Sequence, residues 1–357
     1  MREVELHITD IQQFIQCRQR WYWQSPLRCH LQPAGTPPAL FLGQGVHVAL
    51  DKYYQTPKPR DSRYAAEVLK KWCIDRATKI QEYTGRLWHQ ERDMINDMYA
   101  LGAVMLEHYH LWAEPLDEYL EVIETESRFC LDVPTPDNDP KFTDDIHLTF
   151  AGRMDGIVRD VRTGDLYLLE FKTTSRLTNA RYVMRSLQSP AYAWAADRLY
   201  GDIKGVIYRF LVKKPPHQLK WLAKSGRFSV AMNQKTSYEW ARRDIEQWAV
   251  ANDLDPLEAA KEYRTFLLGL HSRGNEYFKE FIVPRTRYQM DNAIRAVYEY
   301  GKLMSNPDIP IFTHGGFHCS YCPFADPCSL MEQGMDYQGL LDAEYGTRTY
   351  WEASDGS

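Results

Sequence analysis

Residues 151–174 read AGRMDGIVRDVRTGDLYLLEFKTT, and they carry the clearest β-strand signal in the chain. Residues 150–160 and 166–173 are rich in apolar and β-branched side chains, and the Thr163-Gly164 pair between them is typical of a tight turn. The stretch therefore predicts a hairpin. Because both strands carry apolar residues on both faces, we expect them to be buried in the centre of a sheet.

The expected register of this hairpin gathers charged side chains at one point. If the turn has two residues, Asp155 falls opposite Lys172 and diagonal to Glu170 on one face of the hairpin. Buried charges are costly unless they are paired or bind a metal. Carboxylates are the ligands that Mg²⁺ and Mn²⁺ prefer, and a lysine beside them can orient or deprotonate a water or stabilise negative charge. The pattern indicates a divalent-metal site, or alternatively a structural ion pair.

The overall composition is that of a globular protein. The 357 residues are 44% hydrophobic and 25% charged, with a net charge of −5. This charge is unusual for a nucleic-acid-binding protein, but carboxylates that hold a metal lower it, and a local basic groove can still bind a strand. No apolar run reaches the length of a membrane span, and the first residues, MREVELHITD, do not resemble a signal peptide. We expect a cytoplasmic protein without membrane contact, in the host cytoplasm if it is phage-encoded.

The rest of the chain is predicted to wrap this short β centre in helices. Helices are expected over residues 8–25, 42–54, 62–115 (two of them), 178–200 and most of 236–305; strands are also expected over residues 120–130 and 205–212. We predict one domain over residues 1–332, followed by a tail, 333–357, without clear periodicity. Within it we distinguish a helical part (1–118), a β core (119–215), a helical region (236–305) and a cysteine cluster (314–330).

The cysteines indicate a second metal or cluster site. In a chain with seven cysteines and no export signal we expect no disulfide bonds. Cys319-x2-Cys322-x5-Cys328 supplies three thiolates, and a closed [4Fe–4S] or tetrahedral zinc site needs a fourth ligand. The candidates for the fourth thiolate are Cys17, Cys29, Cys73 and Cys130. His314 and His318 could contribute to a zinc site.

Four motifs in the order expected for one family widen the argument. They are Gly43-x-Gly45-x-His47, then Gly152-Arg153-Met154-Asp155, then Glu170-Phe171-Lys172-Thr173, and finally Gln188-x3-Tyr192. Together they resemble the PD-(D/E)XK nuclease superfamily, in its RecB-like branch, over most of the chain. Met154 replaces the proline that names the superfamily. The resemblance implies a restriction-endonuclease-like α/β fold, with a central mixed sheet flanked by helices and helical insertions.

The resemblance also assigns roles to these residues. It implies that His47, Asp155, Glu170 and the main-chain carbonyl of Phe171 bind Mg²⁺ or Mn²⁺. Asp155, Glu170, Lys172 and Gln188 would form the catalytic set, with Lys172 as the catalytic lysine and Gln188 positioning the lysine, water or DNA. Glu126 is expected either to support the site from a neighbouring strand or to be an exposed strand residue.

The same branch contains members with an iron–sulfur cluster, among them the CRISPR-associated RecB-like exonucleases and the AddB nuclease domain. They use one early cysteine and three late ones. Cys17, Cys319, Cys322 and Cys328 match this pattern, which implies a [4Fe–4S] staple between the two ends of the domain, with zinc as the alternative. Residues 205–229 also resemble stand-alone phage nucleases.

The sequence thus predicts a deoxyribonuclease. We expect a metal-dependent DNA exonuclease that acts on single-stranded DNA or DNA ends in recombination, repair or phage DNA processing. The candidate DNA contacts are Arg18, Arg20, Arg153, Arg185 and Tyr192, because cations track phosphates and aromatic rings stack on bases. The alternatives are a non-catalytic DNA-binding or adaptor subunit and a zinc-stabilised interaction protein. The sequence leaves open whether a protein partner joins it in a recombination or CRISPR-like complex, and the helices over residues 236–305 receive no function from the sequence.

Overall fold

The computed structural model describes residues 2–33, 37–136, 146–177 and 179–347. Its helices are α1 (Ile8–Gln16), α2 (Arg18–Gln24), α3 (Pro38–Gln55), α4 (Ser62–Thr84), α5 (His89–Asp117), α6 (Ala180–Met184), α7 (Gln188–Tyr200), α8 (Tyr238–Ala251), α9 (Pro256–Glu262), α10 (Arg264–Arg273), α11 (Arg287–Ser305), the 3-10 helix η1 (Phe317–Tyr321), α12 (Ala325–Glu332) and α13 (Tyr337–Glu344). Its strands are β1 (Arg2–His7), β2 (Leu31–Pro33), β3 (Leu120–Asp132), β4 (Ile146–Asp160), β5 (Leu166–Thr174), β6 (Ile203–Val212), β7 (Trp221–Leu222), β8 (Arg227–Phe228), β9 (Phe278–Pro284) and β10 (Tyr345–Thr347).

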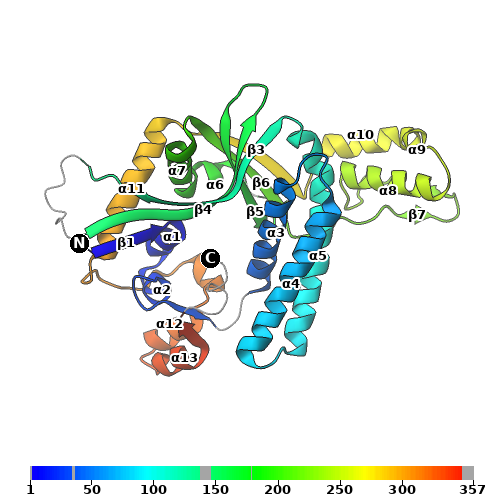
Figure 1. Ribbon diagram of the computed structural model, residues 1–357. Helices are drawn as coiled ribbons and strands as arrows, with labels where there is room; N and C mark the ends of the chain where they lie inside the picture. The colour runs from blue at the N-terminus through cyan, green and yellow to red at the C-terminus, as the bar shows by residue number, and fades with distance from the viewer. Residues whose placement is uncertain (1, 34–36, 137–145, 178, 348–357) are drawn as a thin grey trace.

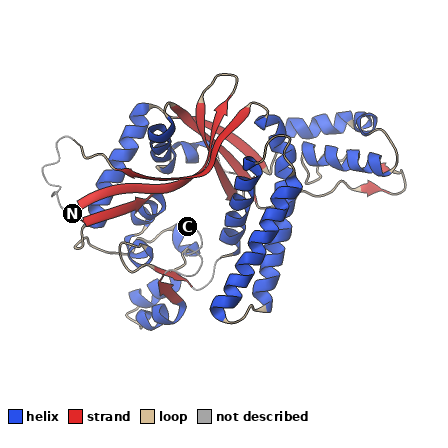
Figure 2. Cartoon of the chain, viewed as in Figure 1, coloured by secondary structure: helices blue, strands red, loops and turns tan. Residues whose placement is uncertain are grey.

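A mixed sheet occupies the centre of the molecule (Figures 1 and 2). Strand β3 pairs with one edge of β4. Strands β1 and β5 pair with successive parts of the other edge of β4, and β6 and β9 continue the sheet beyond β5. The pairs β1–β4 and β5–β6 are parallel, whereas β3–β4, β4–β5 and β6–β9 are antiparallel. The parallel pair β5–β6 is joined through α6 and α7, as parallel strands require a crossover connection.

Helices cover both faces of this sheet, each over its own hydrophobic core. One core joins the sheet to α1, α7 and α11, through residues such as Phe150, Trp194 and Val297. The other joins it to α3, α4 and α5, through residues such as Leu50 and Leu169. The central strands are therefore buried on both faces, as their apolar sequences predict.

The hairpin β4–β5 forms, but its predicted turn is wrong. Gly156 pairs with Leu169 and Arg159 with Leu166, and the backbone N–H of Asp160 donates to the carbonyl of Asp165 at 2.9 Å. Residues 161–164 therefore form the connection in place of a two-residue turn. The register is displaced by two residues from the predicted one. Because side chains alternate with a period of two, this displacement keeps every side chain on its predicted face.

Several other predicted boundaries also need correction. The helix expected over residues 8–25 is interrupted at Cys17, whose backbone is extended with φ −161°. The helix expected over residues 178–200 is divided into α6 and α7. Residues 236–305 contain the strand β9, which forms because β6 offers it an antiparallel partner. The strand β1 was not expected, and it pairs with residues 146–151 of β4, which are distant from it in sequence.

Segments from the N- and C-terminal parts of the described chain pack together. Strand β2 pairs with β10, and Trp23, Phe324 and Leu341 form a small buried cluster between α2, α12 and α13. The tail is therefore more ordered than its sequence indicates up to residue 347, and residues 348–357 lie outside the described part. The apolar contacts alone already join the N- and C-terminal segments.

Helices α8, α9 and α10 project from the body beside α5 as a separate arm (Figure 1). The arm has its own hydrophobic cluster, formed by residues such as Ile245, Phe266 and Leu270 together with Leu219 and Phe228 from the segment that leads into it. Among the described residues, no helix combines the length and apolar character needed to cross a membrane.

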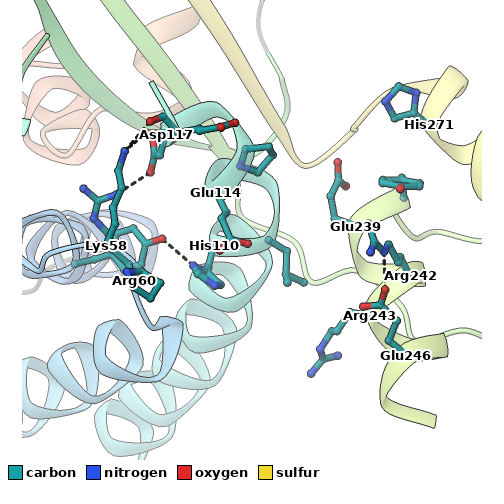
Figure 3. A pocket seen from close by; sticks show the side chains of 16 residues that line it. Lys58, Arg60, His110, Glu114, Asp117, Glu239, Arg242, Arg243, Glu246 and His271 are labelled. Carbon is teal, nitrogen blue, oxygen red and sulfur yellow. Dashed lines mark hydrogen bonds and ion pairs between the residues drawn. The ribbon is translucent and has the colours of Figure 1, made fainter. Parts of the chain in front are cut away.

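The face of the sheet that α3 and α5 cover contains a buried arginine. Arg209 on β6 is fully buried and donates to Asp117 Oδ1 at 2.7 Å and to Glu280 Oε2 at 2.8 Å. It also donates to the hydroxyls of Tyr54 (2.6 Å) and Tyr109 (2.9 Å). Figure 3 shows Asp117 from the outer side, where Lys58 and Arg60 approach it. This network joins α3, α5, β6 and β9 under the strand that carries Phe171.

Candidate active site

The site forms where β4 and β5 separate. Residues 146–151 of β4 pair with β1, and residues 156–159 pair with β5. No described strand pairs with residues 152–155 along this edge. Strand β5 leaves β4 after Leu169, and its residues 170–174 pair with β6 instead. The strands thus open a fork at the positions of Asp155 and Glu170.

Asp155 connects the fork to helix α3. Its Oδ1 lies 3.1 Å from Nδ1 of His47, and its Oδ2 accepts a hydrogen bond of 2.7 Å from the backbone N–H of Phe171. The N–H and C=O groups of one residue in a strand point to the same edge, so the Phe171 carbonyl also turns toward Asp155. Three of the four predicted metal ligands therefore meet around this carboxylate.

Glu170 and Lys172 lie on the face of β5 that α7 covers. Lys172 Nζ donates to Glu170 Oε1 at 2.5 Å and to Gln188 Oε1 at 3.3 Å, and Gln188 Nε2 donates to the same Glu170 oxygen at 3.0 Å. The Glu170 side chain is 5% exposed, whereas that of Lys172 is 36% exposed. Lys172 is thus the member of this group that reaches outward.

Burial and the charges of neighbouring side chains shift the pKa values of His47, Glu170 and Lys172. Burial opposes the charged form of His47, but the neighbouring Asp155 carboxylate outweighs it and raises the histidine pKa. Burial likewise raises the pKa of Glu170, against the opposing effect of Lys172. Burial opposes the charge of Lys172, but Glu170 and Asp155 raise its pKa above the ordinary value. In this arrangement Lys172 is a cation, which favours electrostatic stabilisation over proton abstraction.

Two motif glycines allow the elements of the site to approach each other. A Cβ on Gly43 would lie 3.0 Å from Thr173 Oγ1, so Gly43 lets α3 pack closely against β5. A Cβ on Gly152 would lie 2.8 Å from both Tyr192 Oη and Phe129 Cζ. Gly152 and Tyr192, from two of the quoted motifs, are therefore in contact, and α7 rests on β4 through them.

A cleft of about 910 Å³ opens beside Lys172 and Gln188. Tyr208 also lines it, since β6 pairs Tyr208 with Glu170, and burial raises the pKa of its hydroxyl to about 12. Thr9 and Gln12 on α1 line the same cleft. Sequence reasoning missed these three residues, because the pairing of β5 with β6 and the position of α1 depend on tertiary contacts. A polar residue inside the apolar run of β6 was the available signal for Tyr208.

The comparison with protein families agrees with this geometry. The sequence profile of the PD-(D/E)XK nuclease superfamily matches residues 6–329. The chain belongs to the PD-(D/E)XK nuclease superfamily. A search of curated proteins finds no match. Members of this superfamily are usually nucleases that use Mg²⁺ or Mn²⁺, so membership supports a nuclease, and the mixed sheet with flanking helices agrees with a restriction-endonuclease-like fold.

The donor set of this superfamily member suits a hard divalent cation in its chemistry. Two carboxylates, an imidazole and a main-chain carbonyl converge at the fork, and burying the carboxylates is costly without a compensating cation. In the conformation described, however, Asp155 is bonded to His47 and Glu170 to Lys172. Across the described residues, no group of three or more His, Cys, Asp or Glu side chains is arranged to hold a metal ion.

Glu126 proves to be close to the superfamily site. It lies on β3 with its backbone in the left-handed region, φ 52°, at the position opposite Asp155. A non-glycine residue in this conformation is strained and often marks a functional region. Its carboxylate lies 2.6 Å from Nε of Arg153, and burial raises its pKa to about 7. Its side chain is 18% exposed, so the alternative of an exposed strand residue is wrong.

The predicted DNA contacts fall into different surroundings. Tyr192 is buried against Phe129 and Gly152, which leaves no ring face for a base in this conformation. Arg153 is paired with Glu126, and Arg18 donates to the Pro310 carbonyl at 3.1 Å. Arg20 is bonded to Gln16 and Gln24. Arg185 is exposed at the end of α6.

The predicted cysteines lie around one cavity, but among the described residues they form no group arranged to hold a metal ion. Cys17, Cys319, Cys322 and Cys328 all line one cavity of about 190 Å³, with His314 and His318. Burial raises the pKa of Cys328 to about 11, and Nε2 of His318 is buried without a hydrogen-bond partner. Soft thiol donors and an orphaned imidazole nitrogen fit a transition metal or a cluster in chemical type. Of the other candidates for the fourth thiolate, Cys73 and Cys130 lie in α4 and β3, outside this cavity, and Cys29 packs in the adjoining cluster.

Proposed function

We propose that the protein is a metal-dependent DNA exonuclease of the RecB-like branch, acting on single-stranded DNA or DNA ends. One observation carries the proposal. His47, Asp155, Glu170, Lys172 and Gln188 come from α3, β4, β5 and α7, and they converge beside an open cleft large enough for a nucleotide segment. A structural ion pair would need only two of them. The proposal extends to a single nuclease domain over residues 1–332 working in the cytoplasm on recombination, repair or phage DNA.

Each residue has a proposed task in hydrolysis. His47, Asp155, Glu170 and the Phe171 carbonyl would hold Mg²⁺ or Mn²⁺, which supplies an activated water and neutralises charge on the phosphate when bound. Lys172 would stabilise the anionic phosphate oxygens, because its Nζ is protonated and faces the cleft. Gln188 would keep Lys172 and Glu170 oriented through its bonds to both.

We expect cleavage to depend on a divalent cation and on a free DNA end. The purified protein should degrade a labelled linear single strand with Mg²⁺ or Mn²⁺, lose activity in EDTA, and recover it when excess metal is added. A covalently closed single-stranded circle should resist it. Cleavage of the circle would replace the exonuclease by an endonuclease, and cleavage that persists in EDTA, or no cleavage with either metal, would contradict the proposal.

We further propose that Cys17, Cys319, Cys322 and Cys328 hold a [4Fe–4S] cluster. Support comes from their shared cavity and from the meeting of α2 with η1 and α12, which draws together cysteines from both ends of the domain. The cluster would act as a staple that adds to the apolar contacts there, because closing so long a loop restricts the unfolded chain strongly.

Protein purified without oxygen should be brown, with four iron atoms per chain, and Cys17→Ala should lose the visible absorption. Cys130→Ala is the matched control, because Cys130 is exposed on β3 outside the cavity and should leave the colour unchanged. A colourless wild-type protein containing one zinc ion would instead assign the cavity to zinc. Loss of colour in both variants would remove the assignment to these four cysteines.

A further inference from the structure

A long stretch of the chain carries positive charge alone. Residues 203–238 contain no aspartate or glutamate, although the whole chain has a net charge of −5. The stretch contains Lys204, Arg209, Lys213, Lys214, Lys220, Lys224, Arg227 and Lys235. Arg209 is bonded within the buried network, but the cations after Val212 lie outside the central sheet. Such an imbalance within an acidic protein indicates a local surface for an anionic partner.

The structure holds this stretch in a defined shape on the arm α8–α10. The backbone N–H of His217 donates to the carbonyl of Lys235 at 2.8 Å, and that of Lys220 donates to Gln234 Oε1 at 3.1 Å. Arg273 of α10 donates to the carbonyls of Met232 (2.7 Å) and Thr236 (2.5 Å). The arm thus fixes the backbone of the stretch, so that little order remains to be gained when its lysines bind a ligand.

The stretch lines a cavity that adjoins the candidate active site. The cavity, of about 590 Å³, is lined by Lys214, His217 and Lys235, and by Arg176 and Leu177. Arg176 and Leu177 also line the cleft beside Lys172. The two spaces are therefore neighbours that share these two residues, and the 590 Å³ cavity lies beside the cleft. Glu276 is the only acidic side chain that lines the 590 Å³ cavity in the described part of the chain.

The cations of this surface have no ionic partners among the described residues. None of Arg176, Lys214 and Lys235 makes an ion pair there, and Lys214 and Lys235 are exposed. The cavity of about 820 Å³ between α5 and α8 offers a contrast (Figure 3). There Arg242 is paired with Glu246 at 2.6 Å and Arg60 with Asp117 at 3.4 Å. The charges of that cavity largely neutralise one another, whereas those beside the active site remain available to a ligand.

We propose that a basic lane binds the phosphate backbone of single-stranded DNA where the strand extends beyond the active site. The lane is formed by Arg176, Lys214, His217 and Lys235. The inference rests on the proposed nuclease function and assigns a role to the arm α8–α10. Unpaired lysines in a groove neutralise phosphates and release counterions, which makes binding strong and salt-dependent. The lane lies to one side of the fork, so it engages the strand beyond the scissile phosphate and favours substrates long enough to reach it.

The test compares DNA binding by two charge-matched variants. Fluorescence anisotropy in EDTA measures the affinity of the full-length protein for a labelled single strand across a range of salt concentrations. Lys214→Glu/Lys235→Glu should bind roughly tenfold more weakly at physiological salt, and its salt dependence should fall by about 1.4 log units per log unit of salt for two lost contacts. Lys70→Glu/Lys71→Glu, with the same charge change on exposed positions of α4, should bind like the wild type. Circular dichroism verifies that both variants are folded.

The outcomes separate this inference from the function on which it rests. In the presence of metal, the lane variant should cleave a trinucleotide like the wild type but degrade long strands more slowly. If the lane variant binds and degrades long strands like the wild type, the lane is wrong while the nuclease function stands. Equal weakening by both variants would reduce the effect to net charge and would also overturn the lane. A wild type that neither binds nor cleaves DNA would overturn the proposed function itself.

Discussion

Asp155→Asn is expected to lower the rate of DNA cleavage by about a thousandfold or more, because it removes a charge that the metal and the site share. A loss of about 4 kcal/mol of transition-state stabilisation on removal of one charged metal ligand corresponds to that factor. The substitution keeps the shape of the side chain, and the amide oxygen can still accept the hydrogen bond from the Phe171 N–H. The fold should therefore survive. Lys172→Met should lose activity by about a hundredfold or more through the removal of its positive charge.

Single-turnover cleavage of a linear single strand at saturating Mg²⁺ measures both effects. Glu121→Gln is the matched control, because Glu121 is a half-exposed carboxylate on β3 that pairs with Arg159 away from the fork. It should cleave like the wild type. Thermal melts followed by circular dichroism should coincide for all of these variants. Cleavage by Asp155→Asn within tenfold of the wild-type rate would show that hydrolysis takes place elsewhere or needs no carboxylate here.

The largest expected loss of stability comes from the network around Arg209. Asp117→Ala removes a carboxylate that is 4% exposed and leaves the fully buried guanidinium with one acidic partner in place of two. Breaking a buried ion pair in this way costs about 3–5 kcal/mol of unfolding free energy. Urea unfolding followed by circular dichroism measures the loss. The exposed pair of Arg159 and Glu121 provides the comparison, and Glu121→Ala should cost less than about 1 kcal/mol.

A second variant keeps this prediction decisive if Asp117→Ala fails to fold. Asp117→Asn retains one acceptor oxygen, enough for the hydrogen bond from Arg209 or for that from Tyr54, so it should lose only part of the stability. The network also supports the site, since Tyr54 stacks on Phe171 with ring centroids 5.6 Å apart. Cleavage by Asp117→Asn should consequently fall less than that by Asp155→Asn. Equal stability of Asp117→Ala and the wild type would contradict the structural role of the buried pair.

The cysteines show how far a spacing pattern can reach. Three thiols within ten residues predicted a common site, and Cys17 was among four candidates to complete it. The family resemblance selected Cys17 from these candidates, and in the structure Cys17 lines the same cavity, because α1 ends there and an extended residue turns the chain into α2. Measuring iron and zinc in the purified protein decides between a cluster and a zinc ion in this cavity.

The sequence by itself determined the local parts of the site. Helix hydrogen bonds join residues four apart and strand faces alternate with a period of two, so α3, β4, β5 and the common face of Glu170 and Lys172 follow from neighbouring residues. The two-residue error in the hairpin register was harmless for the same reason. The resemblance to the PD-(D/E)XK nuclease superfamily further implied that His47 and Gln188 would join the hairpin.

The tertiary structure alone decided how these parts meet. Strands β1 and β9 form only because distant strands supply their hydrogen bonds, which no local pattern announces. The fork between β4 and β5 forms where β4 pairs with β1 and β5 pairs with β6 instead of with each other. This separation makes the charged residues of the predicted hairpin accessible to a substrate. The position of the basic lane beside the cleft likewise depends on tertiary contacts, since Lys214 and Lys235 are distant in sequence from Lys172.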